Sequence, residues 1–168
     1  MDTSELRADY IEAMACTAAA VTVVTTAGLA GRFGQTVSAA TSVTADPPTM
    51  LACLYRRTAI AEAVLANGCF AVNVLAPEQR ALSRIFAGGE PIGRRYVFDD
   101  AWRTLCTGAP VRTDGAAVFD CALSDSVLVG THLVLFGRVR AARAGETEGL
   151  TYRDRGYGRH HPEIGRPA

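Results

Sequence analysis

The sequence predicts a mainly β protein whose antiparallel strands close, or nearly close, into one barrel. About six segments rich in β-branched and apolar residues are separated by turns or short helical stretches, a spacing typical of all-β barrels. Closure also removes the exposed edges that an open sheet would present. With 168 residues, 49% of them hydrophobic, and no internal repeat or linker, the chain is expected to form one domain over 1–168.

A helix and a β-hairpin are expected first. Asp2 and Glu5 have the spacing of a capping box, which predicts a short helix at the N-terminus. Residues 20–26 (AVTVVTT) are mostly β-branched and predict a strand. A glycine-containing turn over 27–31 then leads into a second strand over 32–38.

The next part of the chain predicts a strand followed by a helix. A polar stretch of small residues, 36–44, ends at the Asp-Pro-Pro sequence of 46–48. Residues 49–55 (TMLACLY) then predict a buried strand. Thr58 is expected to be the N-cap of a helix that ends just before Gly68.

A second strand and helix follow. Residues 69–75 (CFAVNVL) predict another buried strand, and Pro77 at a first helical position opens a helix that ends at Gly88 and Gly89. The stretch 90–114 has no clear period, so it is expected to be mostly loop around Trp102. The indole of Trp102 is expected to pack in the core or an interface rather than against a ligand.

Two long strands, 117–129 and 132–144, are expected to complete the barrel, with Gly130 and Thr131 as the turn between them. The tail from Arg153 is rich in arginine, glycine and histidine, and part of it is expected to be mobile. Residues 1–9 and about 159–168 are therefore expected to be peripheral or mobile.

Composition limits the possible functions. Seventeen basic side chains balance seventeen acidic ones, so broad nucleic-acid binding is not expected. No apolar run approaches the roughly 20 residues that cross a membrane, and acidic residues precede any apolar stretch at the N-terminus. The five cysteines form no C-x-x-C pair, which favours reduced thiols in a cytoplasmic protein. No metal site is expected, because His160 and His161 have no third ligand within reach in the sequence.

The segment 34–57 is the most informative for function. Between 36 and 44, five hydroxyl side chains alternate with small residues: Thr36, Ser38, Thr41, Ser42 and Thr44. Small side chains let a flat ligand approach the backbone, and hydroxyls and N–H groups can bond to its polar edge. An ordinary strand edge rich in serine and threonine would have the same composition, so this pattern alone leaves both interpretations open.

A possible anion site follows the next strand. Arg56 and Arg57 precede Thr58 at the predicted helix start, where backbone N–H groups and the helix dipole favour a phosphate. A solvated pair of charges beside an ordinary cap is the alternative. The hydroxyl-rich stretch and the anion site, about twenty residues apart, together suit a flavin nucleotide.

Ordered short motifs give the sequence a resemblance to the flavin reductase family, the short reductase components of two-component flavin-dependent monooxygenases. The resemblance spans about 10–157 and rests on VTVVTT at 21–26, TVSA at 36–39, SVTADPP at 42–48, FAVNVL at 70–75, FAGG at 86–89, TGAP at 107–110, FDC at 119–121, GTH at 130–132 and FG at 136–137. It implies an FMN-binding split β-barrel of Greek-key type with a few short flanking helices.

The resemblance also implies roles for individual residues. The flavin ring and ribityl chain would contact Thr36, Val37, Ser38, Ala39, Ala40, Ser42 and Val43, and the phosphate end would contact Arg57, Thr58, Ala59 and Ile60. Phe86, Ala87 and Gly88 would line the flavin pocket from the partner subunit of a homodimer. His132 would lie beside the flavin and the nicotinamide as the catalytic residue, and Tyr152, Arg155 and Tyr157 would contribute to the nicotinamide site.

The resemblance implies an NAD(P)H-dependent flavin reductase that supplies reduced flavin to a separate monooxygenase. It leaves FAD or FMN open, with a slight preference for FAD, and it leaves NADH or NADPH open. A flavin-binding or shuttling protein without nicotinamide turnover is one alternative, and a split-barrel reductase of another ligand, such as a corrinoid, is a second. No G-x-G-x-x-G motif follows a strand, so a Rossmann dinucleotide site is not supported.

Three positions depart from the family pattern. Val37 stands where many relatives have alanine, which narrows the expected ring platform. Thr131 replaces an acidic residue before His132, which removes a charged neighbour from the imidazole. Tyr157 is followed by Gly158 instead of a histidine, which leaves the C-terminal assignments the least supported.

Overall fold

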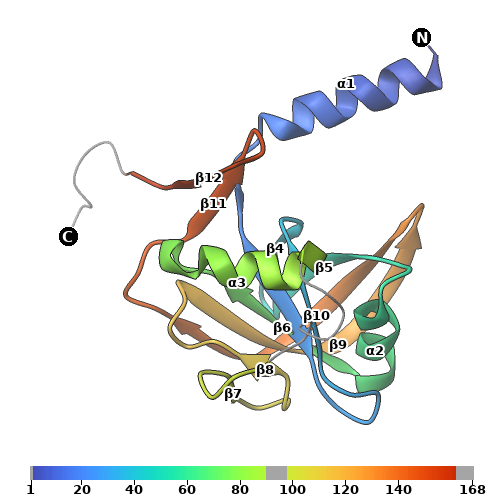
Figure 1. Cartoon of the computed structure of the whole chain (residues 1–168). Helices are drawn as coiled ribbons and strands as arrows, with labels where there is room; N and C mark the ends of the chain where they lie inside the picture. The colour runs from blue at the N-terminus through green and yellow to red at the C-terminus, as the bar shows by residue number, and fades with distance from the viewer. Residues whose placement is uncertain (1, 90–97, 162–168) are drawn as a thin grey trace.

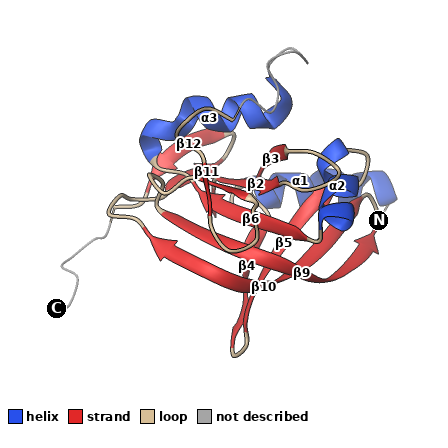
Figure 2. Cartoon of the chain, turned by 90° about the horizontal axis from the view of Figure 1, so that it is seen from below, coloured by secondary structure: helices blue, strands red, loops and turns tan. Residues whose placement is uncertain are grey.

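The computed structural model describes residues 2–89 and 98–161 of the chain. Its centre is a seven-stranded antiparallel sheet with the strand order β3-β2-β6-β9-β10-β5-β4. Its two edge strands, β3 (Phe33–Val37) and β4 (Ala40–Ala45), are joined by only Ser38 and Ala39. A flat sheet would hold these edges about 29 Å apart, whereas this connection reaches about 11 Å at most. The sheet therefore curls into a barrel, as Figures 1 and 2 show, and the predicted class is confirmed.

The remaining strands belong to the barrel, to a small hairpin sheet or to a two-stranded ribbon. The other barrel strands are β2 (Thr22–Thr26), β5 (Pro48–Tyr55), β6 (Cys69–Val74), β9 (Ala117–Val129) and β10 (His132–Ala144). The hairpin sheet contains β1 (Ala19–Ala20), β11 (Leu150–Arg153) and β12 (Gly156–Arg159), and the ribbon contains β7 (Arg103–Thr104) and β8 (Pro110–Val111).

The predicted N-caps of the first two helices and the predicted end at Gly68 are confirmed. Asp2 caps α1 (Thr3–Ala15) in a capping box with Glu5, and Gly68 ends α2 (Ala59–Asn67) with a φ of 69°. From Pro77 a 3₁₀ turn η1 (Pro77–Gln79) continues into α3 (Arg80–Arg84) and a π-type segment η2 (Ile85–Gly89). In Figure 1, α1 projects away from the barrel, and none of its residues is buried. Within 2–89 and 98–161, no helix combines the length and the apolar character needed to cross a membrane.

Several strands differ from the sequence prediction. The polar stretch of small residues, for which no strand was predicted beyond residue 38, contains β4, which pairs with β5 and exposes most of its residues. Residues 150–159 form the β11–β12 hairpin, which was not predicted and which pairs with β1. The loop around Trp102 contains β7 and β8. The expected mobile end beyond residue 161, and the loop over 90–97, lie outside the described residues.

Among the clusters of buried side chains, two pack helical segments against the barrel. Phe70, Leu54 and Ile60 are fully buried between the barrel strands and α2. A second cluster packs Phe86 of η2 against Trp102, with 5.6 Å between the ring centroids. Trp102 is therefore a core residue, as predicted, and the cluster fixes η2 against the barrel.

The structure predicts a clear order of thiol reactivity. Burial, with a smaller contribution from the charge of Asp120, raises the pKa of the Cys121 thiol to about 12, so it is protonated at neutral pH. Cys69 is also buried, whereas Cys16 and Cys106 are exposed. A thiol-exchange reagent should modify Cys16 and Cys106 rapidly, and Cys69 and Cys121 only after unfolding in guanidinium. Peptide mapping that finds Cys121 modified in the native protein would contradict this order.

Candidate functional site

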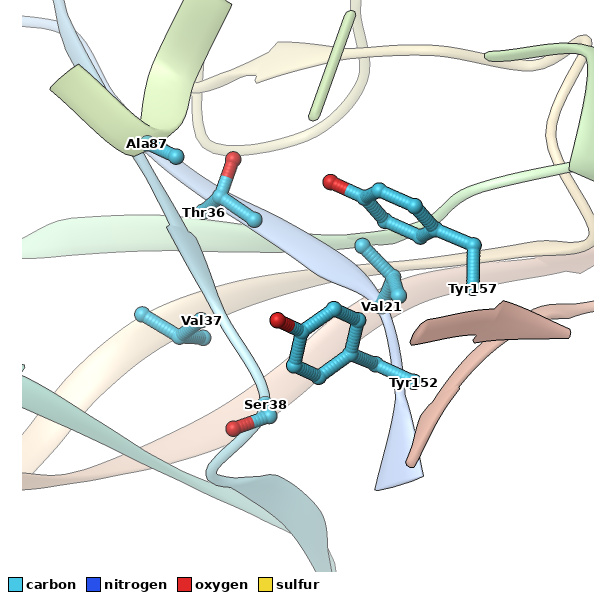
Figure 3. Close-up of a pocket in the computed structure, with 7 residues that line it drawn as sticks. All are labelled: Val21, Thr36, Val37, Ser38, Ala87, Tyr152 and Tyr157. Atoms are coloured by element: carbon cyan, nitrogen blue, oxygen red, sulfur yellow. The ribbon is translucent and has the colours of Figure 1, made fainter. Parts of the chain in front are cut away.

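A cavity of about 230 Å³ opens between β3 and the β11–β12 hairpin. In Figure 3, the rings of Tyr152 and Tyr157 face the strand that carries Thr36 and Ser38 across this cavity. We refer to residues 36–38 as the Thr36 wall and to Tyr152 with Tyr157 as the tyrosine wall. The lining residues are Val21, Thr36, Val37, Ser38, Ala87, Tyr152 and Tyr157.

The Thr36 wall offers one fixed hydroxyl and one available hydroxyl. Thr36 Oγ1 donates a hydrogen bond to the carbonyl oxygen of Ser83 at 2.7 Å, which fixes its side chain. Ser38 lies in the exposed bend between β3 and β4, and its hydroxyl makes no hydrogen bond to the part of the chain that the structure describes. Val37 also lines the cavity, but its side chain is only 9% exposed and belongs to the barrel core. Ser38 is therefore the side chain of this wall best placed to bond a ligand.

The tyrosine wall is a rigid pair of rings. Tyr152 and Tyr157 are directly opposite in the β11–β12 ladder, and their ring centroids lie 5.2 Å apart at an interplanar angle of 67°. The hydroxyl of Tyr157 is 2.7 Å from Ser83 Oγ on α3. Tyr152 is paired with Ala19 of β1, which attaches the hairpin to the barrel. This wall presents aromatic surface of the kind against which a planar ring can stack.

A second cavity of about 200 Å³ shares Thr36 and Ala87 with the first. The two cavities are therefore neighbours along β3, and together we call them the β3 cleft. The second cavity is lined by Gly34, Gln35, Thr36, Thr58, Ile85, Phe86, Ala87 and Gly88, so it extends the cleft to the start of α2.

The start of α2 has the features of an anion site. Thr58 occupies the N-cap position, but its hydroxyl donates to the carbonyl oxygen of Tyr55 at 2.7 Å and does not cap the helix. The backbone N–H groups of the first turn are therefore not capped by the Thr58 side chain, and the positive end of the helix dipole lies beside the cleft. Arg56 and Arg57 are exposed in the turn just before it. This arrangement can bind a phosphate.

A third cavity, of about 320 Å³, continues from the other end of the cleft and shares Ser38 and Tyr152 with the first. Ala39 and Arg155 line it, as the sequence analysis expected of site residues. Arg155 lies in the turn of the β11–β12 hairpin, where Asp154 and Arg155 have φ angles of 47° and 58°. The backbone N–H of Asp154 donates to the carbonyl oxygen of Ala15 at 2.7 Å, which holds this turn against the end of α1.

Some predicted site residues lie outside these cavities in the single chain. Ser42 and Val43 are exposed on β4, Ala40 is half-buried there, and Ala59 is exposed on α2. Ile60 is fully buried in the core, so only its backbone can contact a ligand. His132 is exposed at the start of β10, with its ring 5.8 Å from that of Tyr55 and its Nδ1 3.0 Å from Thr131 Oγ1.

Phe86, Ala87 and Gly88 were expected to reach the site from a partner subunit, and that origin stays a prediction. In the structure they line the β3 cleft beside Thr36 of the same chain. The ring of Phe86 packs directly against the backbone of β3 at Gly34. A Cβ built on Gly34 would lie only 2.5 Å from Cε1 of this ring. Phe86 is 4% exposed and forms the floor of the second cavity rather than an open ring platform.

Sequence reasoning missed several residues of the cleft. Gly34 and Gln35 belong to the motif region, and the glycine before the hydroxyl stretch is a signal of close approach that went unused. Gln35 Oε1 is buried without a hydrogen-bond partner among the described residues. Ser83, which contacts both walls, is one serine within a short helix and has no sequence signal of its own.

A comparison with protein families matches residues 14–161 to the flavin reductase like domain. Among curated proteins, the chain is 51% identical over 150 residues to the FMN reductase (NADH) RutF of Bradyrhizobium diazoefficiens, which covers 89% of this chain and 83% of that protein. The match extends from the end of α1 to the end of the described tail, so it includes every part of the β3 cleft.

Solved structures give the same fold. The NADH:FAD oxidoreductase SgcE6 of Streptomyces globisporus superimposes with a TM-score of 0.85 at 28% identity, covering 96% of this chain and 97% of that one. BorF, the flavin reductase component of a bacterial two-component tryptophan halogenase, gives a TM-score of 0.80 at 29% identity, covering 94% and 98% of the two chains. The split-barrel fold implied by the sequence motifs is thereby confirmed.

Proposed function

This chain belongs to the flavin reductase family, and we propose that it transfers a hydride from NADH to FMN bound in the β3 cleft. The observation that supports this most strongly is that the two cavities of the cleft lie next to each other along β3. An aromatic wall lies at one end, and a helix start that Thr58 does not cap lies at the other. This order of features matches a planar ring that ends in a phosphate.

The residues of the cleft fit a flavin by size and by hydrogen bonding. Ser38, Ala39 and Ala87 are small, which leaves room for a tricyclic ring beside the backbone of residues 36–40. Backbone N–H groups of this stretch and the Ser38 hydroxyl would bond the polar edge of the ring, where they would stabilise negative charge. Thr58 and Arg57, with the first turn of α2, would hold the phosphate. When bound, the flavin supplies the hydride acceptor.

The tyrosine wall would hold the nicotinamide. Tyr152 and Tyr157 lie across the first cavity from Ser38, so a second planar ring between the two walls would stack on the flavin. Hydride transfer requires about 3–3.5 Å between the reacting atoms and little else from the protein. Arg155, on the connected third cavity, would contact the remainder of the dinucleotide.

FMN is favoured over FAD, and NADH over NADPH, because the curated relative that is 51% identical is an FMN reductase (NADH). SgcE6 is an NADH:FAD oxidoreductase, so FAD is the alternative. BorF is the reductase component of a two-component halogenase, and by analogy we propose that reduced flavin passes to a separate flavin-dependent enzyme, a monooxygenase or a halogenase. The five free cysteines favour a reducing compartment such as the cytoplasm.

We also propose that the chain acts as a homodimer. Large apolar side chains are exposed at two places that one chain leaves uncovered, the helix α1 and the tip of the β9–β10 hairpin. A second copy would cover such surface, since contiguous exposed apolar patches mark interaction sites. The residues are Leu6, Tyr10, Ile11 and Met14 on α1 and Val127, Leu128 and Val129 at the hairpin tip.

The decisive experiment follows NADH oxidation by its absorbance under anaerobic conditions, with purified protein and FMN, FAD or no added flavin. Oxidation of NADH that requires both protein and FMN is the expected result. If FMN binds, as detected by fluorescence quenching, but NADH is not oxidised above the rate with FMN alone, the protein is a flavin carrier and the proposed reaction is wrong. If the reaction is faster with FAD than with FMN, or with NADPH than with NADH, the assignment of that cofactor is wrong, but the proposed hydride transfer to a flavin stands.

His132 is tested separately, because in one chain it lies on β10 outside the cavities of the cleft. We propose that its imidazole positions the nicotinamide. His132→Ala should then raise the KM for NADH or lower kcat, while the FMN dissociation constant stays within about twofold of the native value. Loss of FMN binding would assign His132 to the flavin or the fold. The Thr131→Val variant, which removes the hydroxyl beside Nδ1, shows whether the orientation of the ring contributes.

A further inference from the structure

Ser83 is the one residue of α3 that hydrogen bonds to both walls of the β3 cleft within the described chain. Its carbonyl oxygen accepts the hydrogen bond from Thr36 Oγ1 at 2.7 Å. Its own hydroxyl lies 2.7 Å from the hydroxyl of Tyr157. The side chain is completely buried, so water does not compete for these bonds.

The direction of the bond between Ser83 and Tyr157 follows from counting protons. A serine hydroxyl has one proton, and that of Ser83 points to the carbonyl oxygen of Arg80 at 2.9 Å. The bond at 2.7 Å must then be donated by the Tyr157 hydroxyl to Ser83 Oγ. The phenol proton is thus committed to Ser83, so Tyr157 acts as a wall and not as a proton donor to a ligand.

The Tyr157 ring is also held by its neighbours on α3 and β11. The guanidinium carbons of Arg80 and Arg84 lie 5.1 Å and 6.0 Å from the centroid of the ring. The ring of Tyr152 meets it edge-on at 5.2 Å. The hydroxyl bond therefore connects the hairpin to α3. The hairpin is also held by its pairing with β1, by the backbone bond from Leu150 to Leu75 and by the ion pair between Arg159 and Glu78.

We propose that Ser83 is a positioning residue that fixes the separation between the Thr36 wall and the tyrosine wall. This inference rests on the proposed function, in which the flavin and the nicotinamide stack between these walls. The rate of hydride transfer depends steeply on the separation of the two rings, and a misplacement of about 1 Å can cost about a hundredfold. Without the Ser83 hydroxyl, Tyr157 loses its hydrogen-bond acceptor and the hairpin can move away from β3.

The test is a double-mutant cycle with Ser83→Ala, Tyr157→Phe and the combined variant. The measurement is the single-turnover rate of flavin reduction after anaerobic mixing of the FMN-loaded protein with saturating NADH. Each single variant should lower this rate about tenfold or more, and the double variant should be no slower than the slower single variant. The FMN dissociation constant should stay within about twofold, because Ser83→Ala leaves the bond from Thr36 to the Ser83 carbonyl in place.

Ser124→Ala is the matched control, since the exposed Ser124 hydroxyl also bonds a carbonyl oxygen, that of Phe136 at 2.9 Å, but lies on β9 outside the cleft. It should leave the reduction rate unchanged. Unchanged rates in Ser83→Ala and Tyr157→Phe, or losses that multiply in the double variant, would overturn the inference. The inference would also be overturned if the variants lost FMN affinity and thermal stability together with the reduction rate, because that pattern indicates a structural role. If the native protein reduces no flavin, the proposed function itself is wrong.

Discussion

Gly34→Ala is expected to lower the midpoint of thermal unfolding and to weaken FMN binding together. A Cβ at this position would lie 2.5 Å from Cε1 and 2.6 Å from Cδ1 of Phe86, closer than carbon atoms approach in proteins. Overpacking of this kind costs about 1–3 kcal/mol, which corresponds to a fall of about 2–12 °C for a domain of this size. Scanning calorimetry measures this change directly.

Phe86 has little freedom to move away from the added methyl group. It is 4% exposed and packs against Phe98 and Trp102 with centroid separations of 5.5 Å and 5.6 Å. Any shift must displace η2, which carries Ala87 and Gly88 along the β3 cleft. We therefore expect the FMN dissociation constant to rise about tenfold, equivalent to about 1.4 kcal/mol of binding free energy.

Gly149→Ala is the matched control for this substitution. Its added Cβ would meet only Val74 at 3.7 Å and Ala116 at 3.9 Å, which are ordinary van der Waals distances. This variant should keep the native unfolding midpoint within a few degrees and bind FMN normally. If Gly34→Ala behaves like Gly149→Ala, the contact between β3 and Phe86 does not determine the shape of the cleft.

The elements that could be predicted from the sequence are those whose boundaries depend on local chemistry. Asp2 with Glu5 and the left-handed Gly68 define helix ends through bonds within a few residues, and both were located correctly. The strands β9 and β10 also match their predicted bounds, because Gly130 supplies the φ of 56° that their connection needs.

The β11–β12 hairpin could not be predicted in the same way. Its turn places Asp154 and Arg155 in the left-handed region, which aspartate tolerates but arginine does not favour, so the sequence contains only a weak turn signal there. Pairing with β1 and the bond from Asp154 to Ala15 hold the turn, and both contacts join residues far apart in the chain. The hairpin that carries the tyrosine wall was therefore not predicted, although Tyr152 and Tyr157 were assigned to the site from the family resemblance.

The same distinction applies to the candidate site. Thr36 and Ser38 were identified because hydroxyls cluster in one segment, and Thr58 because it precedes a helix. Ser83 was missed because its importance lies in two contacts, to residues 47 and 74 positions away in the sequence. Val37 and Ile60 were also assigned to ligand contact. The side chain of Ile60 is fully buried in the core, whereas Val37 lines the first cavity although it is only 9% exposed.

Arg57→Ala is expected to weaken FMN binding and to leave riboflavin binding unchanged. Arg57 is exposed in the turn before α2, so the proposed role of its guanidinium is a charge-assisted bond to the phosphate, which riboflavin lacks. Loss of such a bond costs about 1.5–3 kcal/mol, or about a 10- to 150-fold rise in the dissociation constant. Quenching of flavin fluorescence measures both ligands in one titration series.

Arg143→Ala is the control for a general loss of positive charge, because Arg143 is exposed near the end of β10 and lines none of the three cavities that contain Ser38 or Thr36. It should change neither affinity. Equal weakening of FMN and riboflavin by Arg57→Ala would mean that the turn before α2 has been distorted. If Arg57→Ala binds FMN with native affinity, the first turn of α2 binds the phosphate without Arg57. Only selective loss of FMN supports a phosphate bound between this arginine and a helix start that Thr58 does not cap.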